Sequence, residues 1–190
     1  MGETEDDLTA RLAHVLRTAR LDRGFSTAAL AAASGVSRAS IVKLERADSQ
    51  PSAALLGRLC APLGLTLSEL FSRTEGPHHA RRLVRAADAP VWTDPATGHR
   101  RRSLSPAPDG PVQLTEIELP AGACATYPAA AYVEIHQQVW VLQGRLDLRE
   151  GAERHDLGAG DCLQLGPASD CTFTNPGPGP ARYLVAVARR

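Results

Sequence analysis

Apolar side chains recur every three or four residues through the first 70 residues of the chain, which is the spacing of amphipathic helices. Breaks near Gly24, Gly35 and Pro51 divide this region, because glycine can turn the chain and proline suits the start of a helix. A last short helix is expected at 66–71. The pattern therefore predicts an all-α bundle of five helices.

After residue 112 the pattern changes to short apolar runs that are split by glycine and proline. Many short strands with regular breaks are typical of an antiparallel barrel or jelly roll. The expected strands are VQLTEIEL, VEIHQQVWVLQGRLDL, DCLQLG, CTFT and RYLVAVA.

The region between these two patterns holds most of the arginine clusters and several prolines, with no long helical pattern. The chain is therefore expected to be an α+β protein of two domains. The predicted boundaries are 8–72 for the helical domain, 73–90 for a linker and 91–190 for the all-β domain, with its core at 112–188.

Residues 26–50 predict two short helices around a tight turn. Ser26 and Ser37 stand where a hydroxyl can cap a helix start, and Gly35 can adopt the positive φ that ends the first helix. The second helix then presents four side chains to solvent: Arg38, Ala39, Lys43 and Arg46. A DNA-binding helix-turn-helix motif needs such a face.

The stretch from LRTARLDRG to LTLSELF resembles the helix-turn-helix domain of phage repressors and of the xenobiotic-response-element family of bacterial regulators. The resemblance covers residues 8–71 and fills each expected core position. It places Ser37 at the start of the recognition helix and implies that Arg38, Ala39 and Lys43 reach base edges, where arginine and lysine donate to guanine and alanine contacts a thymine methyl. It also implies a structural pair of Glu45 with Arg20, and phosphate contacts by Thr27, Arg46 and Ser49.

The composition argues against a membrane protein, a secreted protein and a disulfide framework. Acidic and basic side chains balance at 21 each, so any DNA-binding face is local. No run approaches the roughly 20 apolar residues of a membrane span, and the acidic first residues differ from a signal peptide. We expect no membrane partner and a cytoplasmic location. The four cysteines lack CxxC spacing, so each is expected to be a buried thiol rather than part of a disulfide framework.

Residues 112–188 resemble the cupin domain that is found fused behind such helix-turn-helix domains. The resemblance is carried by VLQGRLDL, GDCLQLGP and the spacing from Cys171 to Asn175. Cupins usually hold a divalent metal through three histidines and one glutamate, ligands that suit iron, manganese, nickel or zinc. This chain departs from that pattern at each position.

Gln137 stands at the glutamate position and Cys171 at the last histidine position. The two remaining histidine positions fall on Ala131 and Val133, or on Ala130 and Tyr132. His136 and His155 are outside the motif positions, and Glu134 would substitute only after a shift of the loop. We therefore expect no metal, no other cofactor and no metal-dependent catalysis.

A barrel of this size can still hold one small ligand. Alternation on the strand at 133–141 places Val133, Ile135, Gln137, Val139 and Val141 inward, with His136 and Trp140 outward. The expected lining of an effector pocket is Gln137, Cys171, Tyr132, Gln164 and Tyr127.

These features predict a transcriptional regulator that binds double-stranded operator DNA as a homodimer and senses a small-molecule effector. The segment 73–90, with Arg81, Arg82 and Arg85, is the expected coupling linker. One alternative is a metal-dependent cupin enzyme, an isomerase or dioxygenase, with an appended DNA-binding domain. A second is an interaction module whose barrel only dimerises. A thiol sensor that uses Cys162 and Cys171 on neighbouring strands is a third.

Overall fold

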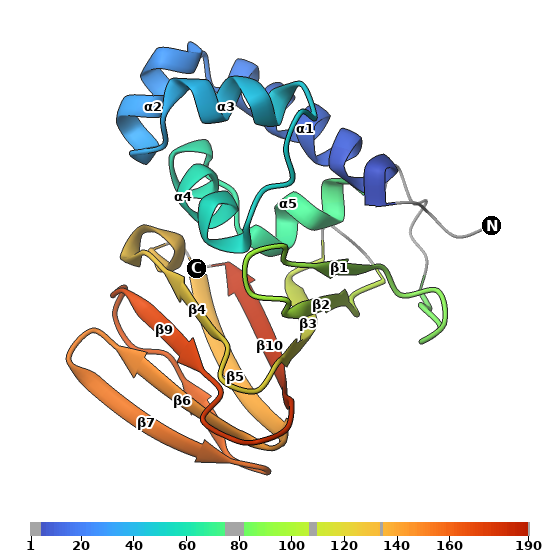
Figure 1. The fold of residues 1–190 in the computed structure, drawn as a ribbon, viewed down its shortest axis with the longest axis vertical. Helices are drawn as coiled ribbons and strands as arrows, with labels where there is room; N and C mark the ends of the chain where they lie inside the picture. Colours follow the sequence, from blue (N-terminus) through green and yellow to red (C-terminus); the bar gives the residue numbers. More distant parts are fainter. Residues whose placement is uncertain (1–4, 75–81, 107–109, 134, 190) are drawn as a thin grey trace. The chain divides into compact units, whose positions relative to one another are not determined.

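The computed structural model describes residues 5–74, 82–106, 110–133 and 135–189. The chain divides into two compact units, residues 1–77 and 78–190. In the described residues the first unit is built of helices and the second of two sheets, as Figure 1 shows in its blue to blue-green and its green-to-red segments. This confirms the predicted fold class of helices followed by a sheet-rich region. Arg81 and Glu134 lie outside the described residues.

Five helices form the first unit: α1 (Glu5–Asp22), α2 (Thr27–Ser34), α3 (Arg38–Glu45), α4 (Ala53–Leu63) and α5 (Leu67–Thr74). Hydroxyls begin three of them, since Ser26, Ser37 and Ser52 each accept a backbone N–H at the first turn. Gly35 ends α2 with φ 64° and Gly64 ends α4 with φ 65°. The buried face of the bundle includes Leu12, Leu30, Ile41, Leu56 and Leu70. The five predicted helices are confirmed, although α5 extends further than expected.

No single described helix is both long enough and apolar enough to cross a membrane. Helices α4 and α5 reach the length and hydropathy of a membrane span only when they are counted together, and the chain bends by 97° between them. Most of their apolar residues belong to the buried core of the helical unit.

Two antiparallel sheets form the second unit (Figure 1). One has the strand order β1-β2-β3-β10-β5-β8 and the other the order β4-β9-β6-β7. The strands are β1 (Val91–Thr93), β2 (Arg100–Ser103), β3 (Val112–Leu119), β4 (Cys124–Tyr127), β5 (Ile135–Gln143), β6 (Arg145–Glu150), β7 (Glu153–Gly158), β8 (Cys162–Gln164), β9 (Cys171–Thr174) and β10 (Ala181–Arg189), with a 3₁₀ turn at Ala129–Tyr132. The pairings among the described residues leave β1, β8, β4 and β7 as edges and do not close a barrel.

The core of this unit lies between the two sheets. Every second residue of β3, β5 and β10 is buried, as in a sheet with one face on a core. Ile117 and Val139 come from one sheet, and Leu148 and Phe173 come from the other, to form one apolar cluster. Ile135, Val139 and Val141 are buried and His136 and Trp140 are exposed, as predicted. Val133 precedes the strand and is exposed, so its inward placement was wrong.

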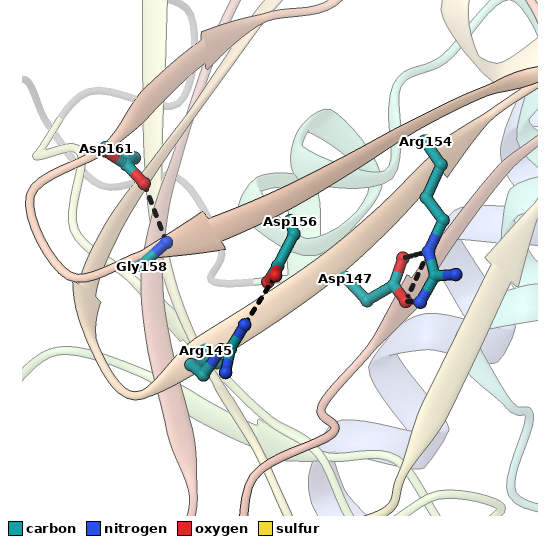
Figure 2. A network of polar contacts seen from close by, with 6 residues as sticks. All are labelled: Arg145, Asp147, Arg154, Asp156, Gly158 and Asp161. Carbon is teal, nitrogen blue, oxygen red and sulfur yellow. Dashed lines mark hydrogen bonds and ion pairs between the residues drawn. The ribbon is translucent and has the colours of Figure 1, made fainter.

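Charged side chains face each other across the pairing of β6 with β7. The register places Asp147 directly opposite Asp156 and Arg149 opposite Arg154, so that like charges face each other. Figure 2 shows how the diagonal pairs relieve this, with Arg145 bound to Asp156 and Arg154 bound to Asp147. Asp161 accepts the Gly158 N–H at 2.8 Å and closes the next turn. Because Arg145, Asp156 and Arg154 are largely exposed, solvent screens both pairs and they contribute little to stability. This network is structural.

Candidate functional site

Helix α3 is fixed at both ends by local hydrogen bonds. Ser37 Oγ accepts the Ser40 N–H at 3.0 Å at the start. At the other end the Ala47 N–H donates to Leu44 O and the Asp48 N–H donates to Lys43 O. These two bonds form a Schellman motif, in which Ala47 takes the left-handed position with φ 60°. Most such positions hold glycine.

The outer face of α3 is open, as the sequence predicted. Arg38, Ala39 and Lys43 are exposed while Ile41 and Leu44 on the opposite side are buried. Within the residues that the structure describes, no ion pair engages either charged side chain of this face. The face therefore offers two cationic donors and a methyl group on one short helix.

The expected phosphate-contacting residues flank this face. Arg46 is exposed and directly follows α3, whereas Thr27 and Ser49 are half-buried. Thr27 is the first residue of α2, where backbone N–H groups favour an anion. Their contacts with DNA stay predictions.

Glu45 faces away from the open side and binds Arg20 on α1. Arg20 Nε donates to Glu45 Oε1 at 2.6 Å, and Nη2 donates to Oε2 at 2.7 Å. Nη1 of the same guanidinium donates to Phe25 O at 2.8 Å, in the turn before α2. The hydrogen bond to Glu45 raises the pKa of Arg20. One buried pair thus joins α1, α3 and the turn before α2, which confirms the implied structural pairing.

The turn between α2 and α3 is also held from α4, which the sequence did not reveal. Arg58 Nη2 donates to Gly35 O, and Arg58 Nε donates to Ser34 O at 3.4 Å. A Cβ at Gly35 would approach Arg58 Nη2 to 3.2 Å. Arg58 is a lone charge in an apolar helix, and its partners are more than twenty residues away, so sequence spacing carries no sign of this contact.

Three of the five residues expected to line the effector pocket lie together between the sheets of the second unit. Tyr127 on β4 pairs in register with Cys171 on β9. Tyr132 and Cys171 are both buried in the apolar core, and Cys171 Sγ donates to Ser169 O at 3.5 Å. Burial raises the pKa of the Cys171 thiol to about 11, so it is protonated at neutral pH. A protonated thiol is a poor nucleophile.

The other two expected residues, Gln137 on β5 and Gln164 on β8, lie on the six-stranded sheet, whereas Tyr127 and Cys171 lie on the four-stranded sheet. Gln164 Nε2 donates to Gln137 O at 3.0 Å and to Leu165 O at 3.2 Å, so this amide supports the edge strand β8. Gln137 is buried and pairs with Val187. No described contact joins either glutamine to the tyrosines.

The described residues contain no group of three His, Cys, Asp or Glu side chains that is arranged to hold a metal. Ala131 and Tyr132 lie in the 3₁₀ turn, and Cys171 is a buried, protonated thiol.

Two predictions about the cysteines were wrong. Cys124 and Cys162 are exposed, whereas Cys60 and Cys171 are buried as expected. Cys162 and Cys171 lie on strands of different sheets, because β8 pairs with β5 and β9 pairs with β4 and β6. The sequence order of the strands gave no guide to the sheet that each one joins.

A buried polar cluster around β1 and β2 was missed. Asp94 and His99 are each 2% exposed, and Asp94 Oδ2 lies 3.6 Å from His99 Nδ1. Thr97 Oγ1 lies 2.7 Å from the same nitrogen. Burial lowers the pKa of His99, and the neighbouring Arg101 lowers it further against the opposing effect of Asp94. The ring is therefore neutral at pH 7.

Arg101 completes this cluster at the centre of β2. Its Nη2 donates to Thr115 Oγ1 at 3.0 Å. Arg101 is only 7% exposed, although its neighbours Arg100 and Arg102 face outward. Burial alternates along β2, but its sequence RRRS does not, so three consecutive arginines give no sign of which one faces inward.

Comparison with known proteins supports the division seen in the structure. Residues 16–70 match the helix-turn-helix family model. The crystal structure of an HTH_3 family transcriptional regulator from Vibrio cholerae matches with a TM-score of 0.79 and 22% identity, over 97% of this chain and 98% of that one. This likeness shows the fold of both units. No curated protein sequence matches the chain.

Two weaker likenesses cover about half of the chain. The cupin domain of Cnp3 from Schizosaccharomyces pombe matches with a TM-score of 0.48 and 14% identity, over 57% of this chain and 74% of that one. A cupin-superfamily sugar phosphate isomerase from Silicibacter pomeroyi has the same score with 20% identity, over 57% and 76%. Neither carries an argument about function.

Proposed function

Because residues 16–70 match the helix-turn-helix family, we propose that this chain is a sequence-specific DNA-binding transcriptional regulator whose sheet unit senses a small molecule. The observation that carries the proposal is the open face of α3. Arg38, Ala39 and Lys43 are exposed on a helix that caps, core residues and the Arg20–Glu45 pair hold in place. A rigid helix with such a face suits the major groove, which admits one helix.

We propose that Arg38 and Lys43 read guanine edges and that Ala39 contacts a thymine methyl. Thr27, Arg46 and Ser49 then contact phosphates, which positions the helix without reading sequence. One short helix reads only a few base pairs, so a homodimer that presents two such helices about 34 Å apart fits successive major grooves.

We propose that the small molecule binds between the two sheets of the second unit. A ligand that binds the sheet unit more tightly in one arrangement of the protein shifts the population toward that arrangement. We propose that the predicted linker, 73–90, transmits this shift.

Selection of bound fragments from genomic DNA tests the proposal. We expect the full chain to enrich a recurrent sequence with two-fold symmetry and half-sites about one helical turn apart. The variant Arg38→Ala is expected to enrich that sequence less strongly, while Arg17→Ala, an exposed arginine on α1, serves as the control. Fragments without any shared sequence would contradict sequence-specific binding.

A further inference from the structure

The outer face of the six-stranded sheet, which is turned away from the core, carries an exposed tryptophan. Trp140 on β5 pairs in register with Leu184 on β10 and with Cys162 on the edge strand β8, so the three side chains share one face. Trp140 is 47% exposed, and Leu142, further along β5, is 37% exposed. These large apolar side chains lie outside the core cluster of the sheet unit.

The apolar surface continues across β5, β10 and β3, which are neighbours in the sheet and lie side by side in Figure 1. On β3, Leu114 pairs with Ala186 and Val112 pairs with Ala188. The outward positions of β5 and β8, and those of β10 from Leu184 to Ala188, are all described and hold no Asp, Glu, Lys or Arg. We call this surface the apolar face, and its main members are Val112, Leu114, Trp140, Leu142, Leu184 and Ala186.

The outer face of the other sheet has the opposite character. There β6 and β7 carry the charged pairs Arg145–Asp156 and Arg154–Asp147, which Figure 2 shows along both strands. An antiparallel sheet that faces water on one side normally carries polar residues there, whereas a large contiguous apolar patch marks an interaction site. The contrast between the two outer faces indicates that the apolar face is covered by a protein surface.

The charges beside the apolar face favour a partner that is not strongly charged. Arg182 Nη2 donates to Glu116 Oε1 at 2.9 Å, and Arg100 Nη1 lies 3.8 Å from Glu118 Oε1. Because acidic and basic groups alternate along this side, it presents no field of one sign to a nucleic acid or a charged peptide. The same face of a second copy matches it, with apolar surface opposite apolar surface and mixed charges opposite mixed charges, as a two-fold interface requires.

The size of the apolar face reaches what a dimer needs. Strands about 4.8 Å apart and outward residues about 6.8 Å apart give it roughly 500 Å². Two copies would therefore bury about 1,000 Å², the lower limit for a specific interface. From these observations we infer that the apolar face binds the apolar face of a second copy and covers Trp140 of each. The inference deepens the homodimer of the proposed function, and it rests on that function only for the use of the dimer in binding DNA.

Sedimentation equilibrium of the full chain tests the interface. We expect the parent to have twice the mass of one chain at micromolar concentration. Trp140→Lys should weaken dimerisation at least tenfold, because it buries an unpaired charge in the apolar face. Thr126→Lys, which adds the same charge at an exposed position of β4 in the other sheet, is the control and should dimerise as the parent does. Leu142→Lys repeats the test on a second exposed residue, and circular dichroism checks that each variant is folded.

Alkylation of the two exposed cysteines gives a second measurement. Cys162 lies beside Trp140 on the apolar face, whereas Cys124 is on β4 of the other sheet. Iodoacetamide labelling, located by mass spectrometry, should be several-fold faster at Cys162 in monomeric Trp140→Lys than in the dimeric parent. The rate at Cys124 should be the same in both proteins.

Three results would overturn the inference: a parent that is monomeric at every concentration, a dimer that survives both lysine variants on the apolar face, or labelling of Cys162 that is equally slow in a monomeric variant. The last would mean that another part of the same chain covers the face. A dimer of the expected kind that enriches no shared DNA sequence leaves the inference standing and removes the proposed function. Enrichment of a symmetric sequence by a dimer that Trp140→Lys does not weaken does the reverse.

Discussion

Arg20 and His99 are both buried ionisable side chains, but only Arg20 is charged at neutral pH. Three nitrogens of Arg20 donate hydrogen bonds, two to the Glu45 carboxylate and one to Phe25 O. His99 is neutral, because burial lowers its pKa. A buried charge that loses its partner is strongly destabilising, whereas a buried neutral ring responds to pH.

Arg20→Ala should lower the free energy of unfolding of the helical unit by about 3 kcal/mol, because it leaves the Glu45 carboxylate without its buried partner. Far-ultraviolet circular dichroism during urea titration measures this loss. Arg17→Ala, an exposed residue on the same helix, is the control and should change stability little. A loss below 1 kcal/mol in Arg20→Ala would contradict a stabilising role for the Arg20–Glu45 pair.

His99 should make the sheet unit less stable in mild acid. Its pKa in the folded state is below the usual value of about 6.5, so the unfolded chain binds the proton first. Stability is then full above pH 6.5 and falls as the pH decreases toward the folded pKa. Urea titrations by tryptophan fluorescence between pH 7.5 and 5 should show this slope in the parent and in His14→Gln, but a flatter one in His99→Gln. Equal slopes in all three proteins would refute it.

At the scale of elements, the sequence predicts best those structures whose causes are local. The starts of α2 and α3 follow from serine hydroxyls three residues away from their partners, and the end of α2 follows from Gly35. β3 and β9 begin and end as the sequence predicted, because alternation or a short apolar run marks them. β1 and β2 were missed, because they are short and β2 is a run of three arginines, of which Arg101 is buried with a hydrogen bond to Thr115 on β3.

The end of α3 offers a direct test of local strain. Ala47 occupies the left-handed position of a Schellman motif, where a side chain costs about 1–2 kcal/mol. Ala47→Gly should therefore raise the free energy of unfolding of the helical unit by several tenths to about 1 kcal/mol, after the greater entropy of glycine in the unfolded chain is subtracted. Ala32→Gly, on the exposed face of α2, should lower stability by a similar amount. If both variants lower stability in urea titration, the strain at Ala47 is absent.

At the scale of the whole molecule, each unit has its own core, and the two proposed roles fall on different units. The open face of α3 belongs to the first unit, and the residues expected to line an effector pocket belong to the second. The sequence predicted the exposed face of α3, because a helix-turn-helix motif is contiguous. Of the expected pocket residues, Tyr127 and Cys171 lie together but Gln137 and Gln164 lie on the other sheet, because residues from strands distant in the chain are brought together only by the sheet topology.

The central claim is that α3 reads DNA sequence, and the most direct measurement is the ratio of affinities for the selected operator and for random duplex at fixed salt. In the parent this ratio should be large. Arg38→Ala should reduce it by about 1–3 kcal/mol if the contact with guanine is bidentate, and Arg17→Ala should leave it unchanged. An equal loss of affinity for both duplexes in Arg38→Ala would contradict base reading and reduce Arg38 to a phosphate contact.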